Sequence, residues 1–179
     1  MKDAGYTAVE TEPLLQPLTG ESFERKSAIT NDDARSDIKC TGFWRRMRAA
    51  YFDIKVVSPY AKSYARLSTA SLFRMAENAK TREYAERIRN VEHGDFNPLV
   101  FTTAGGMAPQ SQLVVKKLAA ALSQKQGISK SVVTGWLRCR LSFALLRTTL
   151  LCVRGTRVRR NYANEANIEL AVSAARIDY

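Results

Sequence analysis

The sequence predicts an α/β or α+β domain, in which a small mixed central sheet is flanked by helices. Three observations predict this class: short apolar runs typical of strands come first, a long amphipathic segment leads into another apolar run, and two helical segments follow. At 179 residues, 45% of them hydrophobic, the chain is long enough for one core and short for two. We therefore expect one domain over residues 1–160 and a tail over 161–179 that includes a short helix.

Apolar runs bounded by turn residues predict four strands. They cover residues 6–9, 35–40, 50–58 and 99–103. The first is expected at a sheet edge, and a loop rich in Pro, Gly, Ser, Thr and Asn follows it. Pro59 ends the third strand, and the last closes in the tight turn Gly105-Gly106.

Three helices are predicted in the remaining sequence. They cover residues 67–91, 109–126 and 129–153. In the first, apolar residues recur near the 3.6 period with charges between them, and Gly94 ends it. Gly127 separates the other two helices.

The expected location is intracellular and nuclear, with no membrane partner. The longest apolar run, 141–153, is interrupted by Arg147 and is shorter than the roughly 20 residues that span a bilayer. The N-terminus lacks the apolar core of a secretory signal. Three cysteines without paired spacing and a single histidine fit a reducing compartment and argue against disulfides and structural zinc.

The positive charge of the chain is segregated. The net charge is +11, and residues 96–164 contain eleven Lys or Arg residues and no acid. Such a basic half suits a polyanion, because phosphate contacts release counterions and give affinity independent of sequence. The alternative is an ordinary basic surface without a nucleic-acid partner.

An acid and a base are predicted inside an apolar strand. Asp53 and Lys55 are two residues apart and therefore point to the same face, which would otherwise be core. Burying both charges costs several kcal/mol unless a partner or a metal compensates. Asp37 lies sixteen residues earlier across a turn, so Asp37 and Asp53 are candidate ligands for Mg²⁺ or Mn²⁺.

Other polar residues are weaker candidates. Lys55 could orient a water or stabilise negative charge beside the metal, and Lys80 and Tyr84, four apart on a helix, share a face that could reach the site. The alternatives are an edge strand with one solvated face and a solvated helix face. Candidate contacts to DNA are Arg35, Arg45, Arg46, Arg48, Arg138 and Arg140, with Trp44 beside three of them.

The order of motifs resembles a known family. The motifs are Glu12-Pro13, Leu18-Thr-Gly-Glu21, Asp33-Ala-Arg-Ser-Asp-Ile38, Gly42-Phe-Trp44, Phe52-Asp-Ile-Lys-Val56, Lys80-x-Arg-x-Tyr84, Pro98-Leu-Val-Phe-Thr-Thr-Ala-Gly-Gly-Met107 and Trp136-Leu-Arg-Cys-Arg-Leu-Ser-Phe-Ala-Leu-Leu146. Over nearly the whole chain they resemble the C-terminal region of reverse-transcriptase-containing retroelement polyproteins. That region is similar to the restriction-like endonuclease of the PD-(D/E)xK superfamily.

This resemblance implies magnesium-dependent nicking of DNA by phosphodiester hydrolysis. It implies that Asp37 and Asp53 bind the metal, that Lys55 is catalytic, and that Lys80 and Tyr84 come from the following helix. It also implies an N-terminally truncated domain, in which Glu12 is the nearest substitute for a further acid. The implied partners are DNA and a reverse transcriptase domain absent from this chain, with no small-molecule cofactor.

Two further hypotheses stay open. The chain could be a catalytically inactive basic module that binds nucleic acid, or a retroelement relic. It could also be a helical interaction domain built on residues 129–153, whose apolar face pairs with a partner.

Overall fold

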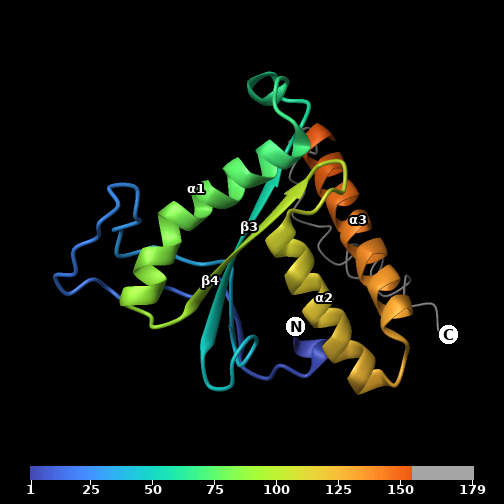
Figure 1. Ribbon diagram of the computed structural model, residues 1–179, viewed down its shortest axis with the longest axis horizontal. Helices are drawn as coiled ribbons and strands as arrows, with labels where there is room; N and C mark the ends of the chain where they lie inside the picture. The colour runs from blue at the N-terminus through green and yellow to red at the C-terminus, as the bar shows by residue number, and fades with distance from the viewer. Residues whose placement is uncertain (155–179) are drawn as a thin grey trace, which may run out of the picture. The chain divides into compact units, whose positions relative to one another are not determined.

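The computed structural model describes residues 1–154, and Figure 1 shows how their helices and strands are arranged. The elements are η1 (Lys2–Ala4), β1 (Val9–Thr11), β2 (Ile38–Thr41), β3 (Ala49–Val57), η2 (Lys62–Tyr64), α1 (Thr69–Asn90), β4 (Asp95–Thr102), α2 (Pro109–Gln126) and α3 (Lys130–Arg154). A first compact unit, Met1–Leu146, contains the sheet, α1, α2 and most of α3. A second unit begins at Arg147, and the helix predicted in the tail lies outside the described residues.

The sheet has four strands in the order β1-β2-β3-β4. β1 with β2 and β2 with β3 are antiparallel pairs, whereas β3 and β4 are parallel. A parallel pair requires a long crossover, and α1 provides it between β3 and β4 (Figure 1). The predicted class, a small mixed sheet with helices, is therefore confirmed.

The strand bounds differ from the prediction at three places. β1 lies at Val9–Thr11, and β2 begins at Ile38, since Arg35 makes only an isolated bridge to Leu14. β4 begins four residues earlier than predicted and includes Pro98. An edge strand accommodates proline because an N–H that faces away from the single neighbouring strand is not part of the ladder.

The core forms on both faces of the sheet. One cluster of buried side chains joins β2, β3, β4 and α2, and its members are Cys40, Phe43, Ala50, Phe52, Leu99, Phe101 and Val114. On the other face, two clusters connect the sheet to α1. The first includes Tyr51, Tyr84 and Ile88. The second includes Val57, Leu72, Ala76 and Val100. Figure 1 shows α1 and α2 on opposite sides of the sheet.

Helix α1 faces the sheet with residues four apart. The side chains in this row are Leu72, Ala76, Lys80, Tyr84 and Ile88, and all except the half-buried Lys80 are buried. Met75 and Ala79, two further apolar residues of this helix, are exposed. Ser68 caps the helix, with its hydroxyl accepting the N–H of Ser71 at 3.2 Å.

The end of α1 differs from the prediction in its mechanism. The helix stops at Asn90, and the left-handed residue that follows is His93, with φ of 52°. Gly94 is required for space, since a Cβ there would lie 2.7 Å from the Tyr51 ring. The turn at Gly105 is tight as predicted, with φ of 87° and its N–H donated to Thr102.

A buried arginine ties the long loop before β2 to α1. Arg87 is 0% exposed, and its guanidinium donates to the backbone carbonyls of Ile29, Asn31 and Gln16 at 3.3, 2.6 and 2.9 Å. These bonds satisfy carbonyl groups of a loop that has little regular structure of its own. The loop leads directly into Asp37, so Arg87 helps to define where β2 starts.

Among the described residues, we find no helix that combines the length and the apolar character needed to cross a bilayer.

Candidate active site

Asp53 lies inside the layer between the sheet and α1. It is 5% exposed and sits on β3 between Tyr51 and Val57, which belong to the two apolar clusters on that face. Its neighbour in register on β4 is Pro98, which cannot donate a backbone hydrogen bond. The predicted acid in an apolar strand is therefore real, and it requires a compensating partner.

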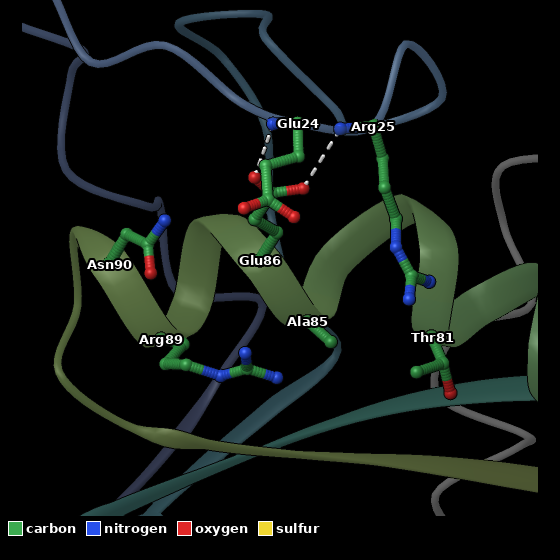
Figure 2. Close-up of a pocket in the computed structure, with 7 residues that line it drawn as sticks. All are labelled: Glu24, Arg25, Thr81, Ala85, Glu86, Arg89 and Asn90. Carbon is green, nitrogen blue, oxygen red and sulfur yellow. Dashed lines mark hydrogen bonds between the residues drawn. The ribbon is translucent and has the colours of Figure 1, made fainter.

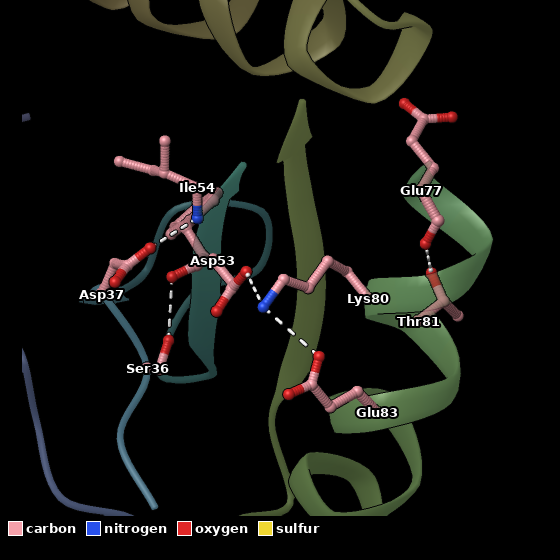
Figure 3. A network of polar contacts seen from close by, with 9 residues as sticks. Ser36, Asp37, Asp53, Ile54, Glu77, Lys80, Thr81 and Glu83 are labelled. Carbon is pink, nitrogen blue, oxygen red and sulfur yellow. Dashed lines mark hydrogen bonds and ion pairs between the residues drawn. The ribbon is translucent and has the colours of Figure 1, made fainter. Parts of the chain in front are cut away.

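Lys80 of α1 is that partner. Its ammonium lies 3.0 Å from Asp53 Oδ2 and 3.3 Å from a carboxylate oxygen of Glu83, as Figure 3 shows. Lys80 and Tyr84 share a helix face, as the spacing predicted, and the Lys80 nitrogen is 5.1 Å from the centre of the Tyr84 ring. Glu83 was not predicted, because on sequence it reads as an ordinary polar helix residue.

Just before β2 begins, the side chains of Ser36 and Asp37 form hydrogen bonds with the backbone of β3. The Ser36 hydroxyl donates to the carbonyl of Phe52 at 2.8 Å, and the Asp37 carboxylate accepts the N–H of Ile54 (Figure 3). Asp37 directly precedes Ile38, which pairs with Phe52, and its charge acts on the nearby Asp53 carboxylate. Two carboxylates, one on β3 and one on the residue before β2, thus lie near each other.

The charges in this group perturb one another. Burial raises the pKa of Asp53, and the nearby Asp37 and Glu83 carboxylates raise it further, whereas Lys80 opposes the shift. Burial would lower the pKa of Lys80, but its pairing with Asp53 and Glu83 raises it above the usual range. Burial and the Asp53 charge also raise the pKa of Tyr84. Such coupling of titratable groups is common at functional sites.

The raised pKa of Asp53 predicts a stability difference that depends on pH. Folded Asp53 holds its proton more tightly than the unfolded chain, so its contribution to stability is full below the ordinary value of 3.8 and is lost as pH rises through the folded pKa. Asp53→Asn mimics the neutral acid. We expect this variant to melt above wild type at pH 7, and the difference to disappear near pH 3.

Thermal melts followed by circular dichroism from pH 3 to pH 8 measure this difference. Glu10→Gln removes an exposed carboxylate, 3.5 Å from Lys39, and serves as the matched control. A lower melting temperature of Asp53→Asn at pH 7 would mean that pairing with Lys80 outweighs burial.

Two further predicted site residues, the catalytic Lys55 and the ligand Glu12, make fewer contacts with this group. Lys55 is half-buried and, by strand alternation, on the Asp53 side of β3. Glu12 is exposed with φ of 50°, and its backbone N–H donates to the Asp37 carbonyl at 2.9 Å. In residues 1–154, no three His, Cys, Asp or Glu side chains converge closely enough to hold a metal ion.

The predicted DNA contacts do not form one surface. Arg35 is exposed two residues before Asp37, while Arg45 and Arg46 are exposed in the hairpin loop at the opposite end of β2. Arg48 is paired with Asp95 at 3.1 Å and also donates to the carbonyl of Gly94. Arg138 and Arg140 are exposed on α3. Other residues of this helix, Leu141 and Leu145, pack against the buried cluster that joins the sheet to α2.

Trp44, predicted as a possible DNA contact, has structural partners. Its ring packs edge-on against Phe43 with centroids 4.8 Å apart, and its indole N–H donates to the Asn97 side chain at 2.9 Å. Trp44 therefore packs against the buried cluster that joins the sheet to α2.

A pocket of about 180 Å³ lies elsewhere, between the long loop and α1 (Figure 2). Its lining residues are Glu24, Arg25, Thr81, Ala85, Glu86, Arg89 and Asn90. The Glu86 carboxylate in it accepts the backbone N–H groups of Glu24 and Arg25, which anchors the loop. None of the predicted site residues lines this pocket.

Comparisons with models of protein families, with curated proteins and with solved structures give no match for this chain.

Proposed function

We propose that the unit Met1–Leu146 is a metal-dependent DNA endonuclease domain of a retroelement, as the sequence resemblance implies. The observation that carries the proposal is the buried Asp53, flanked by the Asp37 and Glu83 carboxylates and paired with Lys80. A carboxylate kept in an apolar layer, beside a second acid and two lysines, suits hydrolysis of a phosphodiester bond better than it suits stability.

Asp37 and Asp53 offer two carboxylates to a divalent ion. Asp53 Oδ2 is buried, and of its two or more acceptor positions the Lys80 ammonium, 3.0 Å away, takes at most one. It therefore keeps an oxygen lone pair for a further partner. Asp37 has a second carboxylate oxygen besides the one that accepts the Ile54 N–H. Asp37 and Asp53 would hold Mg²⁺ or Mn²⁺, which supplies charge neutralisation on the phosphate and activates a water.

The two lysines have separate roles in this proposal. The Lys80 ammonium is fixed by Asp53 and Glu83 and is placed to stabilise negative charge that develops near Asp53. Lys55 is free to orient a water on the same side of β3. Tyr84 packs against Phe96 with ring centroids 5.5 Å apart, and it holds the helix that carries Lys80 in position.

Exposed arginines would bind the DNA backbone. Arg35, exposed two residues before Asp37, would contact phosphates near the cut, and Arg45 and Arg46, in the loop at the opposite end of β2, would contact phosphates farther along the duplex. A domain that cuts chromosomal DNA would act in the nucleus. Its second partner would be the reverse transcriptase domain that the resemblance implies.

Nicking of supercoiled plasmid tests the proposal. With purified protein in Mg²⁺ or Mn²⁺ we expect relaxed circles to accumulate, because a single cut releases the supercoils. EDTA should stop the reaction, and added Mg²⁺ should restore it. Protein that binds the plasmid but cuts it under no divalent metal would overturn the proposal.

One observation favours a second candidate, a catalytically inactive module or relic that binds nucleic acid. Lys80 already neutralises Asp53, so the pair can persist as a structural ion pair without a metal. This alternative predicts affinity for DNA that falls steeply with salt and is not reduced by Asp53→Asn.

A further inference from the structure

The outer face of α3 carries an exposed apolar row. Its members within the first unit are Val132, Trp136, Cys139, Phe143 and Leu146, and all are exposed. They are spaced by four, three, four and three residues, which is the heptad pattern of a helix that pairs with another helix. We call this set the outer seam.

The outer seam is separate from the face that holds α3 on the domain. Val133 is buried, and Leu137, Leu141 and Leu145 pack against the clusters formed with α2 and the sheet. α3 therefore has two apolar faces, and its attachment to the fold uses only one of them. Phe143 is 67% exposed and Leu146 is 55% exposed, and a continuous row of such residues marks an interaction surface more often than single exposed residues do.

The charges beside the outer seam select the partner. α3 contains five Lys or Arg residues and no acid. Arg140 directly follows Cys139 in the seam, and its guanidinium lies 4.7 Å from the centre of the Trp136 ring. In coiled coils, residues at such flanking positions choose the partner by charge. A second copy of α3 would bring like charges together, whereas acidic side chains would be complementary.

A hollow beside Trp136 adds an anchor point. It has a volume of about 310 Å³ and is lined mostly by apolar residues of α2 and α3, together with Arg140 of α3 and with Met1, Asp3 and Ala4 near the N-terminus. An apolar side chain of a docked helix could enter it, as anchor residues do in helix-in-groove recognition.

We propose that the outer seam of α3 binds an acidic amphipathic helix of another protein, whose apolar residues repeat every three and four positions and whose flanking residues are Asp or Glu. This interaction is independent of the nuclease proposal. It assigns Arg140 to the edge of a protein interface rather than to DNA.

Binding of a synthetic helix to the full chain tests this inference. The probe is a peptide of about three heptads with Leu at the seam positions and Glu at the flanking positions, and its matched control carries Lys in place of Glu. Titration calorimetry should show saturable binding of the Glu peptide, weakening as salt rises, and binding of the Lys peptide at least about tenfold weaker.

Two variants locate the interaction. Phe143→Ser removes an exposed seam residue, so it should leave the melting temperature unchanged and weaken the Glu peptide at least about tenfold. Met47→Ser removes an exposed apolar residue in the β2–β3 hairpin loop and should bind like wild type.

Four results would overturn the inference. Equal affinity for the two peptides would show that charge does not select the partner. Unchanged binding by Phe143→Ser would show that the outer seam is not the binding surface. Dimers of the chain that dissociate in Phe143→Ser, seen by sedimentation equilibrium, would identify a second copy as the occupant. Duplex DNA that competes with the peptide, and that binds less tightly to Phe143→Ser, would identify nucleic acid.

Discussion

Asp53→Asn is expected to lower the rate of plasmid nicking about a hundredfold or more. The substitution keeps the shape of the side chain but removes the charge that would bind the metal. Charge stabilisation by a bound ion is worth several kcal/mol in the transition state, and each loss of about 1.4 kcal/mol lowers the rate tenfold. Initial rates of conversion from supercoiled to relaxed plasmid, at saturating Mg²⁺, measure the effect.

Two comparisons make this result specific. Glu10→Gln removes one negative charge from exposed β1 and should nick at the wild-type rate. The expected rise in melting temperature of Asp53→Asn at neutral pH separates lost chemistry from lost folding, since the variant would be more stable and inactive. Nicking by Asp53→Asn within about threefold of wild type would remove Asp53 from the chemistry.

Arg87→Met is expected to cost about 3 kcal/mol or more of the free energy of unfolding. The variant loses three hydrogen bonds from a charged donor to backbone carbonyls in the loop before β2, and it leaves those carbonyls without that partner. Met fills much of the space of the arginine stem, so the loss reports mainly the polar contacts. Urea denaturation followed by circular dichroism measures it.

Arg89→Met is the matched control for this prediction. It removes the same charge from α1 two residues away, at an exposed position, and should change stability by less than about 0.5 kcal/mol. The Arg87 variant should also nick more slowly under native conditions, because the loop that it anchors leads into Asp37. Equal stability of the Arg87 and Arg89 variants would show that the loop keeps its conformation without the buried guanidinium.

Local sequence patterns predicted most of the fold. The 109–126 helix has the predicted bounds, and its start at Pro109 and end before Gly127 follow from backbone preferences of single residues. The mixed sheet with its crossover followed from the order of apolar runs. The predicted start of β4 at residue 99 was wrong because the fully apolar run begins only after Pro98, although an edge strand can include a proline.

The candidate site was only partly predictable because its contacts join distant segments. Asp53 and Lys80 were each singled out, but their pairing depends on how α1 packs over β3, which no local pattern encodes. Glu83 and Arg87 were missed for a similar reason. Charged residues on a helix are usually exposed, and the buried state of Arg87 depends on loop carbonyls more than fifty residues earlier.

Binding of Mn²⁺ to the full chain, followed by electron paramagnetic resonance of the free ion, tests most directly whether Asp37 and Asp53 share a cation. Wild-type protein and Glu10→Gln should each bind Mn²⁺ at a saturable site, and both Asp37→Asn and Asp53→Asn should lose that site. Wild-type protein that binds no Mn²⁺, or binding that persists unchanged in both aspartate variants, would contradict a metal centre at this position in the sheet.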